Sequence, residues 1–303
     1  MSIVVEHCPL CNSSKSQAFD QRRFRDQQVT NRLCSSCGLV YQSPRMSDHE
    51  LDLFYEEEYR QLYQGSQGPN PKDLATQRGR AAALLSFTRP FVTAVNRHLD
   101  IGCSAGSLLL NFQGVYHCQS VGIEPGTAYR EYAQAQGLKV YDSQSEMENQ
   151  KEGRFDLISL AHVLEHIPNP VEYLAHLRQS WLEPGGWLLL EVPNLYGHDC
   201  FEIAHLVSYS PHTLTQVLQQ AGFLVVHKQV HGQPRSQVIP LYLTILAQGQ
   251  PDQDVSSGVQ SSHPVQINIQ PENGVARKRR YSMLRRQVIT RLVPSRAWLQ
   301  LKH

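Results

Sequence analysis

Leu99-Asp100-Ile101-Gly102-Cys103-Ser104-Ala105-Gly106 is the stretch that decides the fold of this chain. It reads as an apolar strand that runs into a turn of small residues, and a helix-like segment follows at 107–112. Small residues let backbone N–H groups approach a ligand, and a helix start favours electron-rich atoms. A second strand at 120–124 ends in Glu124, whose carboxylate is placed to accept hydrogen bonds from ribose hydroxyls. The stretch therefore predicts a βαβ unit that binds a nucleoside.

The spacing of the glycines indicates which nucleoside. A dinucleotide site has the pattern G-x-G-x-x-G, whereas Asp100, Gly102 and Gly106 form D-x-G-x-x-x-G, which leaves little to hold a pyrophosphate. This argues against NAD. Together with Glu124, the turn instead resembles motif I and the following acidic position of class I S-adenosylmethionine (SAM) methyltransferases.

Two further segments extend the resemblance. Residues 155–170, FDLISLAHVLEHIPNP, resemble the fourth strand of that family and the segment after it, and residues 182–194, LEPGGWLLLEVPN, resemble its turn into strand five. An ordinary strand-to-helix turn would explain the glycines but not these two segments. The resemblance implies that the glycine turn binds the methionine end of SAM, Glu124 the ribose, and the region after the third strand the adenine. The cofactor-binding residues it implies are Asp100, Gly102, Cys103, Gly106, Glu124, Asp142, Ser143, Ala161 and His162.

Strand and helix patterns alternate through the middle of the chain. Strands are expected at 97–101, 120–124, 138–141, 155–160 and 187–192, with helices at 105–112, 127–136 and 170–181 between them. Such alternation predicts a parallel sheet with helices on both faces. A helix from the Ser210 cap to Gln220 precedes two strands, at 223–230 and 238–246, expected to form an antiparallel edge. The fold class predicted is α/β, a Rossmann-like seven-stranded methyltransferase fold with a small N-terminal zinc ribbon.

Four of the seven cysteines form two C-x-x-C pairs, Cys8 with Cys11 and Cys34 with Cys37. Two such pairs complete a tetrahedral site, and strand-like pieces at 24–29 and 38–41 suit a zinc ribbon. We expect a structural zinc, whose binding contributes about 10–16 kcal/mol in comparable peptides. A thioredoxin-like redox pair is the rival interpretation, but no βαβ pattern surrounds either pair.

The ribbon, followed by Gln42-Ser43-Pro44-Arg45 and the Tyr-rich segment 51–63, resembles one subfamily of methyltransferases, over residues 8 to about 247. These proteins carry a zinc ribbon and act on sugars, cell-surface glycans and secondary metabolites. The best-known sugar C-methyltransferases have a further large domain, for which too few residues follow here. The function expected is SAM-dependent O- or C-methylation of a small molecule or a sugar or glycan precursor. The alternatives are an RNA methyltransferase, since some of these also carry a zinc ribbon, and a non-catalytic SAM-binding scaffold.

Candidates for the catalytic base come from segments after strands four and five. In an open parallel sheet the ligand lies beyond the carboxyl ends of the strands, and a histidine near neutral pKa suits removal of a proton from a hydroxyl or an acidic carbon. His166 and His205 are the two candidates. The alternatives are that His166 shapes the cofactor pocket, as in many relatives, and that His205 is an exposed loop residue. Methylation of exocyclic base amines is not expected, because 161–164 lacks the Asp/Asn-Pro-Pro-Tyr/Phe signature.

The expected domains are a zinc ribbon at 1–46, a helical lid and linker at 47–96, the SAM-binding core at 97–248, a flexible linker at 249–276 and a basic amphipathic tail at 277–303. In the lid and linker, helices are expected over 47–63, with one buried face that includes Tyr55, Tyr59 and Leu62, and over 74–95, interrupted at Pro90. The tail has no Asp or Glu, so it suits either weak contact with an anionic membrane surface or a helix packed on its own domain. The net charge of +1 gives no overall attraction to nucleic acid, and none is expected as a partner. No apolar run is long enough for a membrane span or a secretory signal, so the expected location is the cytoplasm.

Overall fold

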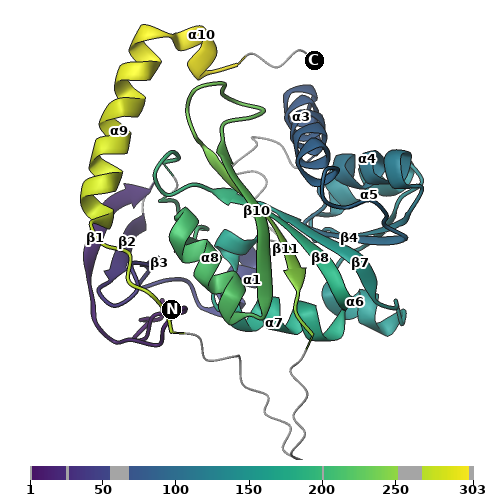
Figure 1. Ribbon diagram of the computed structural model, residues 1–303, viewed down its shortest axis with the longest axis horizontal. Coiled ribbons are helices and arrows are strands. Elements are labelled where there is room, and N and C mark those ends of the chain that lie inside the picture. The colour runs from purple at the N-terminus through teal and green to yellow at the C-terminus, as the bar shows by residue number, and fades with distance from the viewer. Residues whose placement is uncertain (1, 25–26, 55–67, 200, 252–267, 300–303) are drawn as a thin grey trace, which may run out of the picture.

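A computed structural model describes residues 2–24, 27–54, 68–199, 201–251 and 268–299 (Figure 1). Its centre is a seven-stranded sheet with the order β10-β11-β8-β7-β4-β5-β6. The strands are β4 (Arg97–Ile101), β5 (Gln119–Ile123), β6 (Lys139–Tyr141), β7 (Phe155–Ala161), β8 (Leu182–Pro193), β10 (Phe223–His231) and β11 (Tyr242–Gly249). The five strands from β4 to β8 are parallel, which confirms the predicted Rossmann-like α/β fold. β11 lies between β8 and β10 and pairs antiparallel with both, so it runs opposite to the other six strands.

Helices cover both faces of this sheet. They are α3 (Pro71–Thr88), α4 (Ser107–Tyr116), α5 (Thr127–Ala135), α6 (Gln144–Asn149), α7 (Pro170–Ser180) and α8 (Pro211–Gln220). Leu189 of β8 packs with residues of α3 and α4, whereas its neighbours Leu188 and Leu190 pack with residues of α7 and α8. Successive side chains of a strand point to opposite faces, so an apolar run such as 188–190 fills both cores.

The N-terminal residues form a second sheet with the order β1-β2-β3-β9. Its strands are β1 (Ser16–Phe24), β2 (Gln27–Cys34), β3 (Val40–Gln42) and β9 (Val207–Ser208). Of the strand-like piece expected at 24–29, Phe24 ends β1 and residues 27–29 belong to β2, so it is divided between two antiparallel strands. β9 belongs to the methyltransferase part of the chain, so the ribbon extends onto that domain through β3.

Some element boundaries differ from the sequence prediction. The helix expected over 74–95 spans Pro71–Thr88, ending two residues before Pro90, whose ring disfavours a continued helix. β8 begins at Leu182 rather than 187, and β11 begins at Tyr242 rather than 238. α6 was not predicted; its N-cap is Ser143, whose hydroxyl accepts from Glu146 N–H. Of the helix expected at 47–63, α1 (Asp48–Leu53) lies in the described part, and Tyr55, Tyr59 and Leu62 lie outside it.

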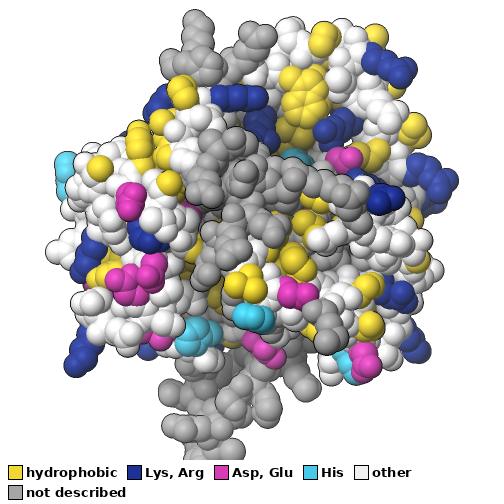
Figure 2. Space-filling view, turned by 180° about the vertical axis from the view of Figure 1, so that it is seen from behind, with side chains coloured by type: hydrophobic (Ala, Val, Ile, Leu, Met, Phe, Trp, Pro, Cys, Tyr) yellow, Lys and Arg dark blue, Asp and Glu magenta, His cyan; other side chains and the backbone are white. Residues whose placement is uncertain are grey.

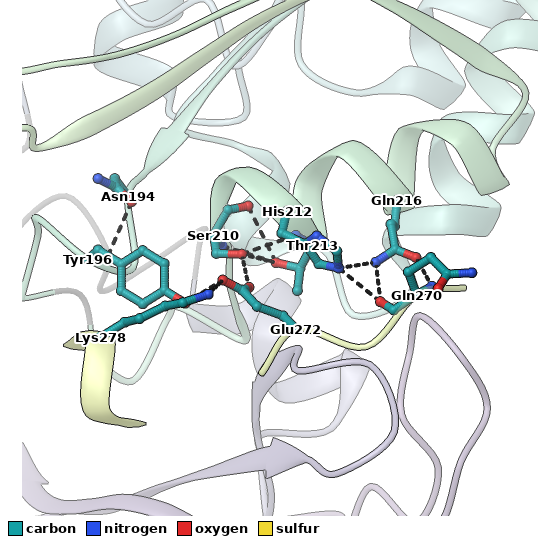
Figure 3. A network of polar contacts seen from close by, with 9 residues as sticks. All are labelled: Asn194, Tyr196, Ser210, His212, Thr213, Gln216, Gln270, Glu272 and Lys278. Atoms are coloured by element: carbon teal, nitrogen blue, oxygen red, sulfur yellow. Dashed lines mark hydrogen bonds and ion pairs between the residues drawn. The ribbon is translucent and has the colours of Figure 1, made fainter. Parts of the chain in front are cut away.

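The described part of the expected linker is bonded to both domains. Glu272 N–H donates to the carbonyl of Cys37 in the ribbon, and the Glu272 carboxylate accepts from Tyr196 Oη, Ser210 Oγ and Lys278 Nζ (Figure 3). The flexible-linker interpretation therefore does not hold for the residues around Glu272, while 252–267 lie outside the described residues.

The tail is helical, with α9 (Val275–Leu292) running along one edge of the molecule, followed by α10 (Pro294–Ala297) (Figure 1). Its inner side packs on the domain: Val275 is buried, and the Arg279 guanidinium donates to the carbonyls of Leu195 and His198. Among the described residues, no helix combines the length and the apolar character needed to cross a membrane.

Candidate functional site

The glycine turn, residues 102–106, connects β4 to α4. Gly102 and Gly106 have φ angles of +72° and +78°, a region that L side chains rarely adopt. A Cβ on Gly102 would lie 2.6 Å from Val163 Cγ2, and one on Gly106 would collide with Leu138. The turn therefore requires glycine at both positions for backbone geometry and for space.

Glu124 directly follows β5, and its carboxylate contacts the backbone of the glycine turn. Its Oε2 accepts from Ser104 N–H at 2.9 Å and its Oε1 from Gly126 N–H at 2.8 Å. Asp100 is buried beside it and lies 2.6 Å from Ser159 Oγ. Burial, together with the charge of Glu124, raises the pKa of Asp100 to about 7 despite the hydrogen bond from Ser159.

The other implied cofactor residues lie at the ends of neighbouring strands. The side chain of Cys103 is buried in an apolar cluster with Leu109 and Leu138. Asp142 and Ser143 follow β6, where Asp142 N–H donates to Glu146 Oε2 and Ser143 caps α6. Ala161 ends β7, His162 follows it, and both are half-buried. These residues therefore all lie at the carboxyl edge of the parallel strands.

His162 has an unusual backbone and two acidic neighbours. Its φ of +60° is uncommon for a non-glycine residue and is typically found at functional sites. Its Nδ1 lies 3.3 Å from Glu165 Oε1, and its Nε2 lies 3.3 Å from Glu191 Oε1. The ring thus connects the segment after β7 to the end of β8.

The two predicted catalytic histidines come together, although they are 39 positions apart in the sequence. The rings of His166 and His205 lie 5.0 Å apart between centroids, and Glu165 lies beside them. His166 Nδ1 is 2.8 Å from the carbonyl of Ala204, and Leu206 N–H donates to the carbonyl of Glu165 at 2.8 Å. Burial lowers the pKa of His166, more than the nearby Glu165 raises it. We call Glu165, His166 and His205 the acceptor-side cluster.

Sequence reasoning missed a second buried group around Glu191 of β8. Its carboxylate accepts from Arg80 Nε at 2.9 Å and from Thr244 Oγ1 at 3.0 Å, and it lies 3.3 Å from His231 Nε2. Burial by itself would raise the pKa of Glu191. His162, His231 and Arg80 outweigh this effect and hold the pKa well below its usual range. The signal in the sequence was a lone acid inside the apolar run 188–192. A charge in such a run needs a buried partner.

The four N-terminal cysteines form a second candidate site. Cys8 Sγ lies 3.6 Å from Cys37 Sγ, Cys11 Sγ lies 3.5 Å from Cys34 Sγ, and all four are free of disulfides. All four sulfurs lie within 4.8 Å of one another. Tetrahedral zinc with Zn–S bonds of about 2.3 Å would space its sulfurs about 3.8 Å apart, so the donors and their spacing fit zinc.

Known proteins resemble this chain in sequence and in fold. A family model described as a methyltransferase domain matches residues 74–228, just over half of the chain. The 1,6-didemethyltoxoflavin-N1-methyltransferase of Burkholderia thailandensis, solved with 1,6-didemethyltoxoflavin and S-adenosylhomocysteine, is 17% identical, with a TM-score of 0.56 over 77% of this chain and 100% of that chain. A SAM-dependent methyltransferase from Archaeoglobus fulgidus is 17% identical, with a TM-score of 0.48 over 63% of this chain and 97% of that chain.

The first of these structures shows that the fold is shared. No curated protein matches the chain significantly. Because the family model covers the glycine turn, Glu124 and the segment after β7, the match includes the residues from which the cofactor site was predicted. The chain therefore belongs to the methyltransferase domain family and is a class I SAM-dependent methyltransferase.

Proposed function

We propose that this enzyme methylates an oxygen or carbon atom of a small molecule or of a sugar or glycan precursor. The observation that carries the proposal is that the glycine turn with Glu124 and the acceptor-side cluster lie at the same edge of the sheet. SAM bound over the glycine turn would present its methyl group toward the segment after β7, since ligands of open α/β sheets lie beyond the carboxyl strand ends.

The reaction needs positioning and the removal of one proton. The acceptor loses its proton, its electron pair forms a bond to the methyl carbon, and the sulfur–carbon bond breaks, so that the sulfonium becomes the neutral sulfide of S-adenosylhomocysteine. Positioning of this kind can supply about 7–11 kcal/mol of the barrier. We propose that His166 and His205 promote loss of the proton, because their rings lie together where the segment after β7 meets the residues before β9.

The hydrogen bond of His166 supports this role. A carbonyl oxygen accepts only, so His166 Nδ1 must carry the hydrogen that it shares with Ala204, and the lone pair is on Nε2. Burial favours the neutral ring that this chemistry requires. The sugar or glycan part of the proposal depends on the subfamily resemblance of the ribbon and the segment after it.

A substrate screen tests the proposed function. Purified protein would be incubated with methyl-labelled SAM and nucleotide-linked sugars, small hydroxylated molecules or total RNA. We expect label in a small molecule, and a decrease in turnover of about 10²–10⁴-fold in His166→Ala or His205→Ala with SAM affinity within a few-fold. His117→Asn is the matched control, because His117 is exposed at the opposite edge of the sheet and asparagine tolerates its left-handed backbone.

Other outcomes of the screen would favour the alternatives. Label in RNA alone would replace the proposal with RNA methylation, and SAM binding without transfer to any class would favour a scaffold. Loss of SAM affinity in His166→Ala would assign that residue to the cofactor pocket. We further propose that the four cysteines hold one structural zinc, which would leave no open position for catalysis.

We also propose that the outer face of α9 contacts an anionic membrane surface. Tyr281, Leu284, Val288 and Leu292 recur at helical spacing and are 53–75% exposed. Arginines flank them, no Asp or Glu occurs after Glu272, and Figure 2 shows apolar and basic side chains interspersed along this edge. An exposed apolar stripe with basic flanks suits the interface of a bilayer that contains anionic lipid.

Vesicle sedimentation tests this contact with the full chain. We expect binding to phosphatidylglycerol-containing vesicles but not to pure phosphatidylcholine, and its loss in Leu284→Asp/Val288→Asp. Because both side chains point to solvent, the variant should fold and bind SAM normally. Equal sedimentation of the variant, or a concentration-dependent dimer that it abolishes, would contradict the membrane contact.

A further inference from the structure

We propose that the acceptor-side cluster, Glu165, His166 and His205, binds a divalent transition-metal cation. This site is separate from the four cysteines. One ligand atom from each of the three residues lies within 4.8 Å of the other two. The proposal builds on the proposed function, because the cation would lie where the methyl acceptor is expected.

The first argument is the carboxylate of Glu165. Glu165 is 2% exposed, and in the described part of the chain neither of its oxygens has a hydrogen-bond partner. His162 Nδ1, at 3.3 Å from Oε1, is its neighbour in an ion-pair contact without hydrogen-bond geometry. A buried carboxylate with its lone pairs unfilled is costly, and a bound cation is one of the few groups that can fill them. The residue is therefore better explained as a ligand than as a packing residue.

The second argument is the orientation of His166. Its Nδ1–H donates to the carbonyl of Ala204, which fixes the tautomer and leaves Nε2 as a Lewis base. Metal-binding histidines almost always donate their other ring N–H to a carbonyl, a carboxylate or water in this way. The arrangement is thus typical of a histidine prepared for a metal.

The third argument is the rigidity of the two segments that supply the ligands. Leu206 N–H, next to His205, donates to the carbonyl of Glu165 at 2.8 Å, and the following residues pair with β3 of the ribbon as β9. Ligand atoms bonded to one cation at about 2.0–2.2 Å lie about 3–3.5 Å apart. Atoms that lie within 4.8 Å of one another would therefore move together by up to about 1.5 Å, a distance that side-chain rotation can supply.

The donor set indicates the kind of cation and its use. Two imidazoles and one carboxylate suit Zn²⁺, Mn²⁺ or Fe²⁺ better than Mg²⁺ or Ca²⁺. Three protein ligands leave coordination positions open, as in catalytic rather than structural metal sites. A hydroxyl of the acceptor bound at such a position would have a lowered pKa and would lose its proton to water, and its oxygen would then attack the methyl carbon. His166 and His205 would then promote loss of that proton indirectly, by holding the cation.

Mn²⁺ binding tests the proposal without requiring turnover. Four thiolates bind Mn²⁺ weakly, so Mn²⁺ binding distinguishes the acceptor-side cluster from the four cysteines. The full-length protein would be treated with EDTA and titrated with MnCl₂, and free Mn²⁺ would be followed by its paramagnetic resonance signal. We expect about one Mn²⁺ per chain, with affinity lowered at least 10-fold in Glu165→Gln and in His205→Ala and unchanged in His117→Asn.

SAM binding by calorimetry would establish that each variant is folded. No Mn²⁺ bound at millimolar concentration by wild type that binds SAM would overturn the proposal, as would binding that both variants retain. Methyl transfer that persists in EDTA with no bound metal would also overturn it, while leaving the methyltransferase assignment intact. Conversely, Mn²⁺ bound through these residues without methyl transfer to any substrate class would count against the proposed function and not against the cation site.

Discussion

Replacement of Glu124 by alanine tests the cofactor site most directly. In the structure the carboxylate has two backbone partners, Ser104 N–H in the glycine turn and Gly126 N–H at the start of α5. A carboxylate oxygen can accept more than one hydrogen bond, so these backbone contacts do not prevent the same group from accepting a ribose hydroxyl. Glu124→Ala would therefore remove both the ribose acceptor and a restraint on the turn.

These two losses have separate magnitudes. A hydrogen bond to a charged group contributes about 1.5–3 kcal/mol, so SAM affinity should fall roughly 10- to 150-fold. The N–H groups of Ser104 and Gly126 would lose this acceptor. A fully buried donor left unpaired costs about 1–3 kcal/mol of folding free energy, and each of these half-buried groups should cost less than that. The variant should therefore bind SAM weakly and also melt at a lower temperature than wild type.

Calorimetry with SAM and with S-adenosylhomocysteine would measure the affinity. Glu124→Gln is the matched control, because its amide keeps one acceptor oxygen and removes the charge, so its dissociation constant should lie between those of wild type and Glu124→Ala. Circular dichroism would establish that both variants fold. A folded Glu124→Ala protein with wild-type affinity for both ligands would refute the assignment of Glu124 to the ribose.

Three further perturbations test other parts of the structure. Cys34→Ser should remove one zinc equivalent per chain, measured by elemental analysis, and lower the melting temperature. Cys103→Ser should keep the metal, because Cys103 packs in another cluster. Iron or a redox-active disulfide in place of zinc would contradict the ribbon assignment. Gly106→Ala should destabilise the fold and weaken SAM binding more than Gly137→Ala, because both glycines have positive φ but only the Cβ at Gly106 meets a neighbouring atom; equal losses would show that the backbone conformation alone sets the requirement for glycine. Asp100 has a pKa of about 7 in the folded state, above its unfolded value, so folded protein retains a proton that unfolded chain releases and stability falls as pH rises from about 4 to 7. Melting curves of Asp100→Asn against pH should therefore lack this fall and lie above wild type near pH 8, and a difference between the two proteins that is constant with pH would contradict the raised pKa.

The parallel core was predictable from sequence because its signals are local. Apolar runs such as 155–161 are long enough to identify a buried strand, and the glycine turn indicates where α4 begins. Errors occurred where the chain gives no local contrast. The sequence of residues 24–29 resembles one strand, because no change in its pattern of apolar and polar residues marks where β1 ends at Phe24 and β2 begins at Gln27. α6 is a six-residue helix, too short for a helical period to be recognised.

The candidate site was less predictable because it depends on contacts across long stretches of sequence. His166 and His205 were each chosen separately, and no feature of the sequence indicated that their rings would lie side by side. Arg80 and Glu191 are 111 positions apart, and only the packing of α3 across the end of β8 joins them. No short sequence motif contains both residues of such a pair, because the number of positions between them depends on the lengths of all the elements in between.

Backbone hydrogen bonds connect the four N-terminal cysteines to the acceptor-side cluster. Cys34 N–H donates to the carbonyl of Leu39, the start of the turn into β3. Gln42 N–H, at the end of β3, donates to the carbonyl of Leu206, and Leu206 N–H donates to the carbonyl of Glu165. This series of backbone hydrogen bonds runs from the cysteine site to the acceptor-side cluster, through the residue next to His205. A group that stabilises the ribbon therefore also fixes the loop that brings His205 to His166, although it touches neither SAM nor the acceptor.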